Sequence, residues 1–242
     1  IPASINNNLP GSEYSIGADT ALNSVVHCVD QIKQSAVASH RCFIVEVMGK
    51  QCGYLALMSG LATGAERVYL PEEGITLDML QRDVHRIVDE FQHGKRLGLF
   101  IRSEGADVSY TTDFIVRLFE KEGADLFDVR QSILGHLQQG GNPTPYDRIQ
   151  ATRLAARAVR MLEERAEAGD TCHGAIGLQR GHVAFTGLED LPGLVDPRAE
   201  RPLEQSWLNL TEVVEAMARR TRTEADAPGR GPDGSEGSDV RS

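Results

Sequence analysis

The sequence has little of what marks nucleic-acid-binding or membrane proteins. Against 35 Asp and Glu there are only 25 Lys and Arg, so the formal net charge of the 242 residues is −10. A chain this acidic repels a phosphate backbone overall, and we expect no nucleic-acid partner. No apolar run approaches the roughly 18 residues that cross a bilayer, and no signal-peptide pattern is present. We therefore expect neither secretion nor a membrane partner.

Cysteine is scarce as well, and its spacing is irregular. The four cysteines contain no CxxC pair. In a chain of this length, such cysteines indicate free thiols in a reducing compartment rather than a disulfide framework. The expected location is the cytoplasm. The cysteines are Cys28, Cys42, Cys52 and Cys172.

Several common catalytic motifs are missing. The sequence has no HExxH, GxSxG, Walker A or GxGxxG pattern, which argues against metalloprotease, hydrolase, P-loop and dinucleotide-binding functions. Cys28 follows His27 directly, but neighbours in sequence do not make a nucleophile and its base. Catalysis by cysteine therefore has little support.

Helical and strand-like patterns alternate along the chain, with short connections. This alternation predicts an α/β fold with an open, mostly parallel sheet and helices on both faces. Thr144, Pro145 and Asp147 have the spacing of a helix start. We expect helices near 22–32, 54–62, 77–91, 114–119, 144–162 and 208–217, and strands near 42–47, 67–70, 97–101 and 132–134. The expected buried stripe of the helix after Thr144 is Leu154, Ala155, Ala158, Met161 and Leu162.

Both ends of the chain differ from its middle. Residues 1–2 read as the middle of a loop, so we expect that a preceding part is missing. From residue 223 the composition becomes Glu, Asp, Pro, Gly, Ser and Arg, which is too polar to build a core. We therefore expect one domain over 1–222 and a disordered tail over 223–242.

Four segments that follow strand-like runs combine glycine or small polar residues with charged or amide side chains. Parallel sheets bind ligands beyond the carboxyl ends of their strands. Glycine lets backbone N–H groups approach an anion, and Arg, Lys, Asn and Gln complete its contacts. A sugar phosphate would use all of these groups. The segments are 4–11, 48–50, 102–104 and 135–141.

Each feature also has a structural interpretation. An Asn-rich segment before Pro-Gly is often only a turn. His136 alone is more often a structural hydrogen-bonding residue, and Arg41 and Arg130 alone are more often surface residues. No single segment decides between ligand binding and structure.

Together, the motifs at residues 4–12, 17–23, 45–49, 52–56, 110–114 and 134–148 resemble the phosphofructokinase family. The resemblance runs from residue 2 to about 207. It is to the C-terminal half of the long, duplicated, eukaryote-type ATP-dependent enzymes. It implies the phosphofructokinase-like version of the α/β fold.

The resemblance implies that this half is not catalytic. The family's catalytic half reads Thr-Ile-Asp-Asn-Asp where this chain has residues 4–8, Ser-Ile-Asn-Asn-Asn. Asn6 occupies the position of the catalytic Asp, and Asn8 also replaces a carboxylate. An amide cannot act as a general base near pH 7. In the eukaryote-type enzymes, the matching pocket binds the activator fructose 2,6-bisphosphate.

The resemblance assigns the effector pocket to fifteen residues, with Arg41 and Arg130 entering the pocket of a neighbouring subunit. A further phosphate contact falls on Arg198 or Arg201, and the sequence leaves that choice open. Lys50 departs from the glycine usual in animal enzymes. The fifteen are Ser4, Ile5, Asn6, Asn7, Asn8, Arg41, Met48, Gly49, Lys50, Glu104, Arg130, His136, Leu137, Gln138 and Gln139.

The implied parent protein is a glycolytic 6-phosphofructokinase that makes fructose 1,6-bisphosphate from fructose 6-phosphate. Its ATP and Mg²⁺ would bind in the catalytic N-terminal half, outside this chain, so no metal site is expected here. A homo-oligomer, with a tetramer expected, would complete the shared pockets. Two alternatives stay open: a stand-alone sugar-phosphate-binding module, and half of a diphosphate-dependent relative.

Overall fold

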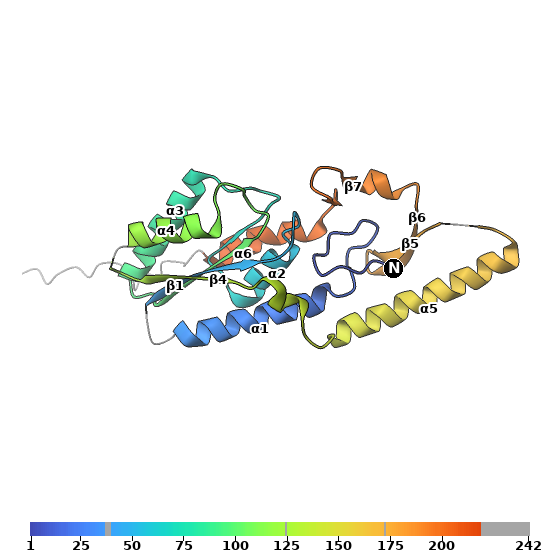
Figure 1. Cartoon of the computed structure of the whole chain (residues 1–242), viewed down its shortest axis with the longest axis horizontal. Coiled ribbons are helices and arrows are strands. Elements are labelled where there is room, and N and C mark those ends of the chain that lie inside the picture. Colours follow the sequence, from blue (N-terminus) through green and yellow to red (C-terminus); the bar gives the residue numbers. More distant parts are fainter. Residues whose placement is uncertain (37–39, 124, 172, 219–242) are drawn as a thin grey trace, which may run out of the picture.

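Four parallel strands form the central sheet of the computed structural model (Figure 1). The structure describes residues 1–36, 40–123, 125–171 and 173–218. The expected tail over 223–242 and Cys172 lie outside the described residues. The sheet order is β2-β3-β1-β4. The strands are β1 (Arg41–Val47), β2 (Arg67–Tyr69), β3 (Leu97–Ser103) and β4 (Asp128–Ile133).

Alternate side chains of β1 face opposite sides of the sheet, and helices cover both (Figure 1). Phe43 and Val45 pack with apolar residues of α1 (Ala18–Ala36), α2 (Tyr54–Thr63) and α6 (Thr211–Ala218). Cys42 and Ile44 pack with α3 (Leu77–Gln92) and α4 (Thr112–Gly123). A strand buried on both faces reads as a continuous apolar run, as β1 does. The predicted parallel sheet with helices on both faces is confirmed.

The helix α5 (Pro145–Ala168) extends away from this sheet (Figure 1). It begins as predicted, because the Thr144 side chain accepts a hydrogen bond from the Asp147 N–H and a proline occupies the first turn. A hairpin of β5 (Gly174–Gln179) and β6 (His182–Gly187) packs against it. We call α5 with β5 and β6 the arm.

Two expectations are corrected, and one element was missed. Strand β4 begins at Asp128 rather than at residue 132. Val129 packs into the core, but most other side chains of this edge strand are exposed, so no apolar run marks its first residues. Within the expected buried stripe of α5, Ala155 and Leu162 are exposed because little of the chain covers this helix. The hairpin of β5 and β6 was not expected, since its glycines interrupt the apolar pattern of both strands.

Short elements complete the chain. Within the part of the chain that the structure describes, a 3₁₀ helix follows each of β4, β6 and a last short strand pair. These helices are η1 (Gly135–Gln139), η2 (Leu191–Leu194) and η3 (Ser206–Leu210). The strand pair is β7 (Val195–Asp196) with β8 (Arg201–Pro202).

Cys28, Cys42 and Cys52 are free thiols. Across the described residues, no helix combines the length and apolar character of a membrane span.

Candidate functional site

The candidate site lies at the carboxyl edge of the central sheet. Because the strands run parallel, the residues that follow β1, β3 and β4 meet at this edge. The Glu104 carboxylate oxygen Oε1, just after β3, accepts hydrogen bonds from the N–H groups of Gly49 and Lys50, just after β1, at 3.1 and 2.7 Å. The two segments predicted separately from the sequence therefore form one structure. The Glu104 side chain therefore holds the backbone of the turn 48–50, in addition to any ligand that it contacts.

Close backbone approach fixes this corner. A Cβ on Gly49 would lie 2.4 Å from the carbonyl oxygen of Cys52, and a Cβ on Gly105 would lie 1.9 Å from that of Lys50. Only glycine fits either position without a shift of the backbone. Lys50 itself adopts a left-handed conformation with φ of 51°, and its side chain is exposed. The turn thus presents one cation at the edge of the site.

The helical turn η1 is tied to the same corner by Gln138. Its side-chain Oε1 accepts a hydrogen bond from the Met48 N–H at 2.9 Å, and its Nε2 donates to the Met48 carbonyl at 3.4 Å. Gln138 is 1% exposed, whereas His136, Leu137 and Gln139 are exposed. The Gln138 side chain therefore positions η1 and leaves its neighbours facing outward.

The segment 4–8, which we call the wall, lies beside the turn 48–52, where the Cys52 thiol donates to the Asn7 carbonyl at 3.7 Å. It is held by its own side chains. The Ser4 hydroxyl donates to Asn8 Oδ1 at 2.8 Å. The Asn7 amide is committed on both sides: Nδ2 donates to the Glu13 carbonyl at 3.0 Å, and Oδ1 accepts from the Ser15 N–H at 2.7 Å. Asn7 thus supports the wall, while Ser4 and Asn8 lie along it. Ile5 packs against the neighbouring apolar cluster.

Two buried oxygen atoms near this edge have no hydrogen-bond partner among the described residues. They are Asn6 Oδ1 and Ser103 Oγ, in residues that are 8% and 0% exposed. Buried polar atoms are nearly always bonded, so an unpaired one is a candidate position for water or a ligand group. Ser103 ends β3 beside Gly49, whose Cβ would lie 3.2 Å from its hydroxyl. Nothing in the residue pattern distinguished Ser103 from its neighbours in the segment 102–104.

The structure distinguishes the two arginines left open by the sequence. Arg201 donates to the Gln51 carbonyl at 2.6 Å and forms an ion pair with Glu72 at 3.4 Å. It therefore lies beside the turn 48–52, and the neighbouring Glu200 carbonyl accepts from Asn8 Nδ2 at 3.5 Å. Arg198 is exposed. We assign the arginine next to the site as Arg201.

Glu72 and Gln205 were missed by the sequence analysis. Both Glu72 oxygens accept hydrogen bonds from the Gly53 N–H at the start of α2, and Gln205 Nε2 donates to Glu72 at 3.1 Å. Glu72 and Gln205 each come three residues after a short strand, β2 and β8, and neither stands in a glycine-rich or Asn-rich segment that would have marked it. Cys52 beside them is no nucleophile, because burial raises the pKa of its thiol to about 12.

Arg41 and Arg130 lie away from this site within the chain. Arg41 begins β1, about 20 Å along the strand from its carboxyl end at 3.3 Å per residue. Arg130 lies on the edge strand β4, is exposed, and pairs with Asp128 at 3.3 Å. The described residues do not bring either arginine to the pocket of the same chain.

Arg102 is structural rather than ligand-binding. It is 3% exposed and forms an ion pair with Glu46 at 2.9 Å. It also donates to the carbonyl groups of Tyr110 and Asp107, at 3.2 and 2.6 Å. These contacts hold the loop that carries Glu104.

Among the described residues, no group of three or more His, Cys, Asp or Glu side chains is placed to hold a metal ion.

A buried clasp joins the wall 4–8 to α5. The Tyr14 hydroxyl donates to Asp147 Oδ1 at 3.1 Å, and Asp147 also accepts from the N–H groups of Gly17 and Thr20 at 2.7 and 2.8 Å. Burial raises the pKa of Tyr14, and the negative charge of Asp147 raises it further. Because Asn7 bonds Glu13 and Ser15, on either side of Tyr14, the wall and the first turn of α5 form one unit.

Comparison with known proteins places this arrangement in a family. The profile described as "Phosphofructokinase" matches residues 1–162. The chain belongs to the phosphofructokinase family. It is 48% identical over 219 residues to the ATP-dependent 6-phosphofructokinase of Dictyostelium discoideum, covering 90% of this chain and 26% of that protein. It is 40% identical over 230 residues to the human muscle type, covering 90% and 30%.

Solved phosphofructokinase structures have the same fold. The Pichia pastoris enzyme in the T-state matches with a TM-score of 0.84 and 37% identity, over 92% of this chain and 27% of that chain. The Saccharomyces cerevisiae enzyme matches with a TM-score of 0.86 and 33% identity, over 90% and 30%. The pyrophosphate-dependent enzyme of Marinobacter aquaeolei shares the fold alone, at 19% identity and a TM-score of 0.61. This phosphofructokinase chain thus spans under a third of the ATP-dependent relatives that it matches.

Proposed function

We propose that this chain is part of an ATP-dependent 6-phosphofructokinase and supplies an effector pocket that binds fructose 2,6-bisphosphate. The observation that carries the proposal is the wall 4–8. It offers hydroxyl and amide groups, no carboxylate, and one buried unpaired oxygen, Asn6 Oδ1. Such a wall can hold sugar hydroxyl groups beside phosphates without repelling them. The similar proteins from Dictyostelium discoideum and Macaca fascicularis are ATP-dependent 6-phosphofructokinases, which supports ATP as the donor of the parent enzyme.

The same wall makes this part of the enzyme inactive. Phosphoryl transfer from ATP to a sugar hydroxyl needs a group that takes the hydroxyl proton. Asn6 cannot take it, and general-base catalysis is worth roughly 10²–10⁴-fold in rate. ATP and Mg²⁺ then bind in a catalytic half outside residues 1–242.

Cations around the wall favour a ligand with two phosphates. Lys50 and Arg201 come from this chain, and Arg201 also pairs with Glu72. The exposed His136 adds a hydrogen-bonding side chain. Arg41 and Arg130, which lie far from the wall in their own chain, reach the pocket of a neighbouring subunit. The working protein is then a cytoplasmic homo-oligomer, with a tetramer as its proposed form. A pocket shared between subunits ties effector binding to subunit arrangement.

Calorimetric titration of the full-length parent enzyme with fructose 2,6-bisphosphate tests this function. Arg130→Ala should weaken binding by about 1.5–3 kcal/mol, because a hydrogen bond to a charged phosphate is lost. Arg117→Ala is the matched control, since Arg117 is 75% exposed on α4 and pairs only with Asp113 among the described residues. Unchanged affinity in Arg130→Ala contradicts the shared pocket. Kinase activity of residues 1–242 alone contradicts the inactive role.

A further inference from the structure

A cavity of about 260 Å³ lies between α3, α6 and the start of β2. Its lining shares no residue with the candidate site. Three arginines line it, Arg67 from β2 and Arg82 and Arg86 from α3, and α6 contributes Thr211 and Glu215. Guanidinium groups from two elements that meet at one cavity are suited to an oxyanion, because each presents several N–H groups in one plane.

Asp83 fixes two of these arginines. It is 4% exposed, and its Oδ2 accepts hydrogen bonds from Arg67 Nε and from the Tyr69 hydroxyl, both at 3.1 Å. Its Oδ1 accepts from Arg86 Nη2 at 3.2 Å. The guanidinium groups of Arg67 and Arg86 are thereby held in place before any ligand arrives, and preorganised groups lose little freedom on binding.

Arg86 and Arg82 both have donors left for a further acceptor. Arg86 Nη2 also donates to the Glu66 carbonyl at 3.0 Å, but its Nε is buried without a hydrogen-bond partner among the described residues. A buried N–H without a partner is unfavourable, so an added acceptor is favoured there. Arg82 pairs only with Asp78 in the described part, and these side chains are 64% and 72% exposed. Exposed pairs of this kind contribute little.

The position of Glu215 shows that Arg67 accepts an oxyanion at this cavity. Glu215 Oε1 accepts a hydrogen bond from Arg67 Nη1 at 2.6 Å, and the Glu215 side chain is 40% exposed. An anion from solution would therefore compete with this carboxylate for Arg67. The remaining carboxylate of the lining, Glu66, is neutralised by its ion pair with Lys95.

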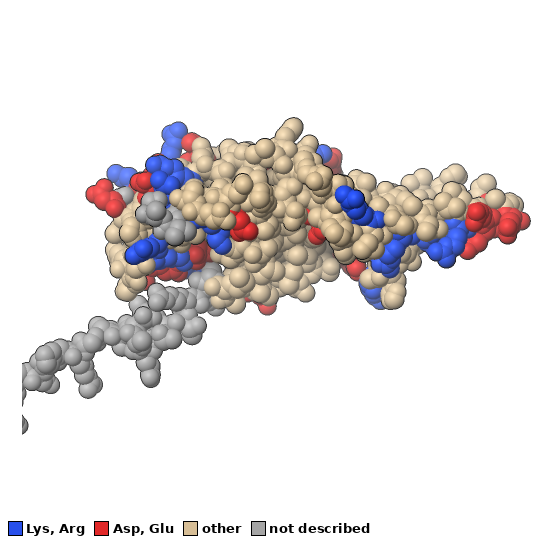
Figure 2. Space-filling model, turned by 90° about the horizontal axis from the view of Figure 1, so that it is seen from below, with Lys and Arg blue, Asp and Glu red and all other residues tan. Residues whose placement is uncertain are grey.

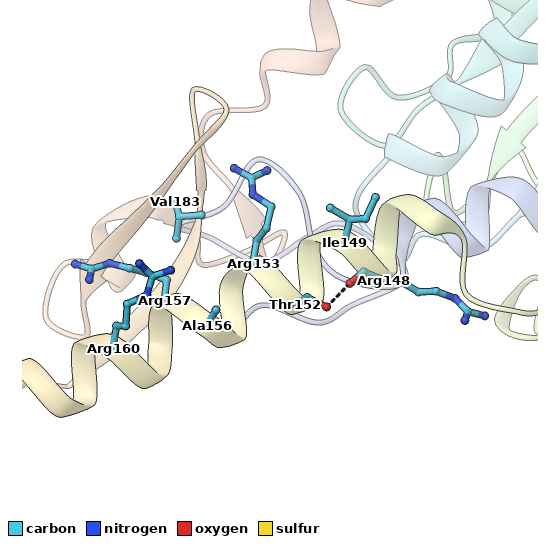
Figure 3. Close-up of a pocket in the computed structure, with 8 residues that line it drawn as sticks. All are labelled: Arg148, Ile149, Thr152, Arg153, Ala156, Arg157, Arg160 and Val183. Atoms are coloured by element: carbon cyan, nitrogen blue, oxygen red, sulfur yellow. Dashed lines mark hydrogen bonds between the residues drawn. The ribbon is translucent and has the colours of Figure 1, made fainter.

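The larger arginine-lined cavity, beside α5, is a poorer anion site. All of its arginines come from one helix, and Figure 3 shows Arg148 pointing away from the others. Arg157 pairs with Glu164 at 3.2 Å, and Arg153 donates to Gln150 at 3.0 Å. Acidic side chains also gather at the end of the arm, beyond the basic ones (Figure 2). Its cations therefore neither converge on one point nor lack partners.

We propose that the cavity between α3, α6 and β2 binds a free phosphate ion through Arg67, Arg82 and Arg86. A tetrahedral phosphate offers an oxygen to each of three guanidinium groups, which a planar carboxylate does not. The volume of about 260 Å³ is below the roughly 300–1,000 Å³ of sites for larger organic ligands, so it suits a small ion with its waters. The inference goes beyond the proposed function, because no residue of the effector pocket takes part.

Hydrogen exchange of the full-length parent enzyme tests this site. Inorganic phosphate is compared with sodium chloride at matched ionic strength, and peptides that cover residues 77–92 are followed by mass spectrometry. At a phosphate concentration ten times the Kd, exchange in these peptides should be about 10-fold slower, because openings that release the ion become rarer. The readout needs no activity, so it stands or fails apart from the proposed function.

Arg82→Gln should raise the Kd for phosphate at least about 10-fold, because a charged donor is lost. Arg117→Gln is the matched control. Arg117 is 75% exposed, pairs with Asp113 four residues before it as Arg82 pairs with Asp78, and lies outside the cavity. It should leave the Kd unchanged.

Glu215→Gln should act in the opposite direction. It removes the carboxylate that competes for Arg67 and repels the ion, so the Kd should fall at least about 3-fold. Glu212→Gln makes the same change of charge at an exposed position of α6 outside the lining, and it should have little effect. A purely structural role of Glu215 would not make phosphate bind more tightly.

Three results overturn the inference. The first is exchange over residues 77–92 that phosphate leaves unchanged. The second is an equal effect of Arg82→Gln and Arg117→Gln on the Kd, which reduces the binding to general charge. The third is weaker binding in Glu215→Gln, which places the ion away from Arg67.

Discussion

At the scale of single residues, the turn after β1 depends on Gly49. Its backbone lies so close to the Cys52 carbonyl that a Cβ would come within 2.4 Å. We expect Gly49→Ala to lower the free energy of unfolding by about 1–3 kcal/mol, as other forced insertions of a methyl group do. Urea unfolding followed by Trp207 fluorescence measures the change.

Gly193→Ala is the matched control for this substitution. Gly193 also lacks a left-handed backbone, and a Cβ there would meet no atom within 4 Å. It should change stability by no more than about 0.5 kcal/mol. Equal effects of the two substitutions would mean that the turn relaxes freely around Gly49.

The residue scale also shows what a sequence can and cannot reveal about the site. Residue types at strand ends predicted where Gly49, Glu104 and Gln138 gather, because strand order in a parallel sheet brings those ends together. They did not predict what each side chain does. Glu104 and Gln138 bond backbone groups of the 48–50 turn, and such bonds depend on distances that only the fold sets.

At the scale of elements, Gln138 is the link between η1 and the end of β1. Gln138→Ala removes both hydrogen bonds to the Met48 backbone. The loss of a buried partner typically costs about 1–3 kcal/mol, and the Met48 amide should exchange its hydrogen at least about 10-fold faster in native conditions. Hydrogen exchange with peptide-level mass spectrometry reads this directly.

The neighbouring Gln139 offers a matched control for Gln138. Its amide is exposed and approaches only the Met48 sulfur, at 3.8 Å. Gln139→Ala should leave exchange at Met48 as it is. If both variants exchange alike, then η1 is held by its own turn rather than by the Gln138 side chain.

Elements differ in how well the sequence predicted them, and burial is the reason. The strand β1 is buried on both faces, so its apolar run marked it within one residue. The edge strand β4 has mostly exposed side chains, and its start was missed by four residues. The hairpin of β5 and β6 was missed entirely, because Gly174, Gly177 and Gly187 pack closely against other atoms and leave no alternation to read.

At the scale of the whole molecule, buried thiols make stability depend on pH. Burial raises the pKa of Cys42 and raises that of Cys52 to about 12, from an ordinary value of 9.0. The folded protein keeps both protons where the unfolded chain loses them. Stability is therefore constant below the unfolded pKa and falls as pH rises above about 9, by up to about 1.4 kcal/mol per pH unit for each thiol.

Urea unfolding between pH 7 and 10, under reducing conditions, measures this dependence. The double variant Cys42→Ala, Cys52→Ala should be less stable at pH 7, because buried volume is lost, yet its stability should fall less steeply above pH 9. Parallel pH profiles for the two proteins would show that other groups govern alkaline unfolding.

The clasp between Tyr14 and Asp147 connects the wall 4–8 to a long helix, so a small rotation at one end produces a larger displacement at the other. It joins the wall of the pocket to the first turn of a helix of 24 residues, about 36 Å long at 1.5 Å per residue. A rotation of about 5° at the clasp would carry the far end of that helix through about 3 Å. Under the proposed function, a small adjustment of the wall around a sugar phosphate would therefore become a larger displacement at the far end of α5.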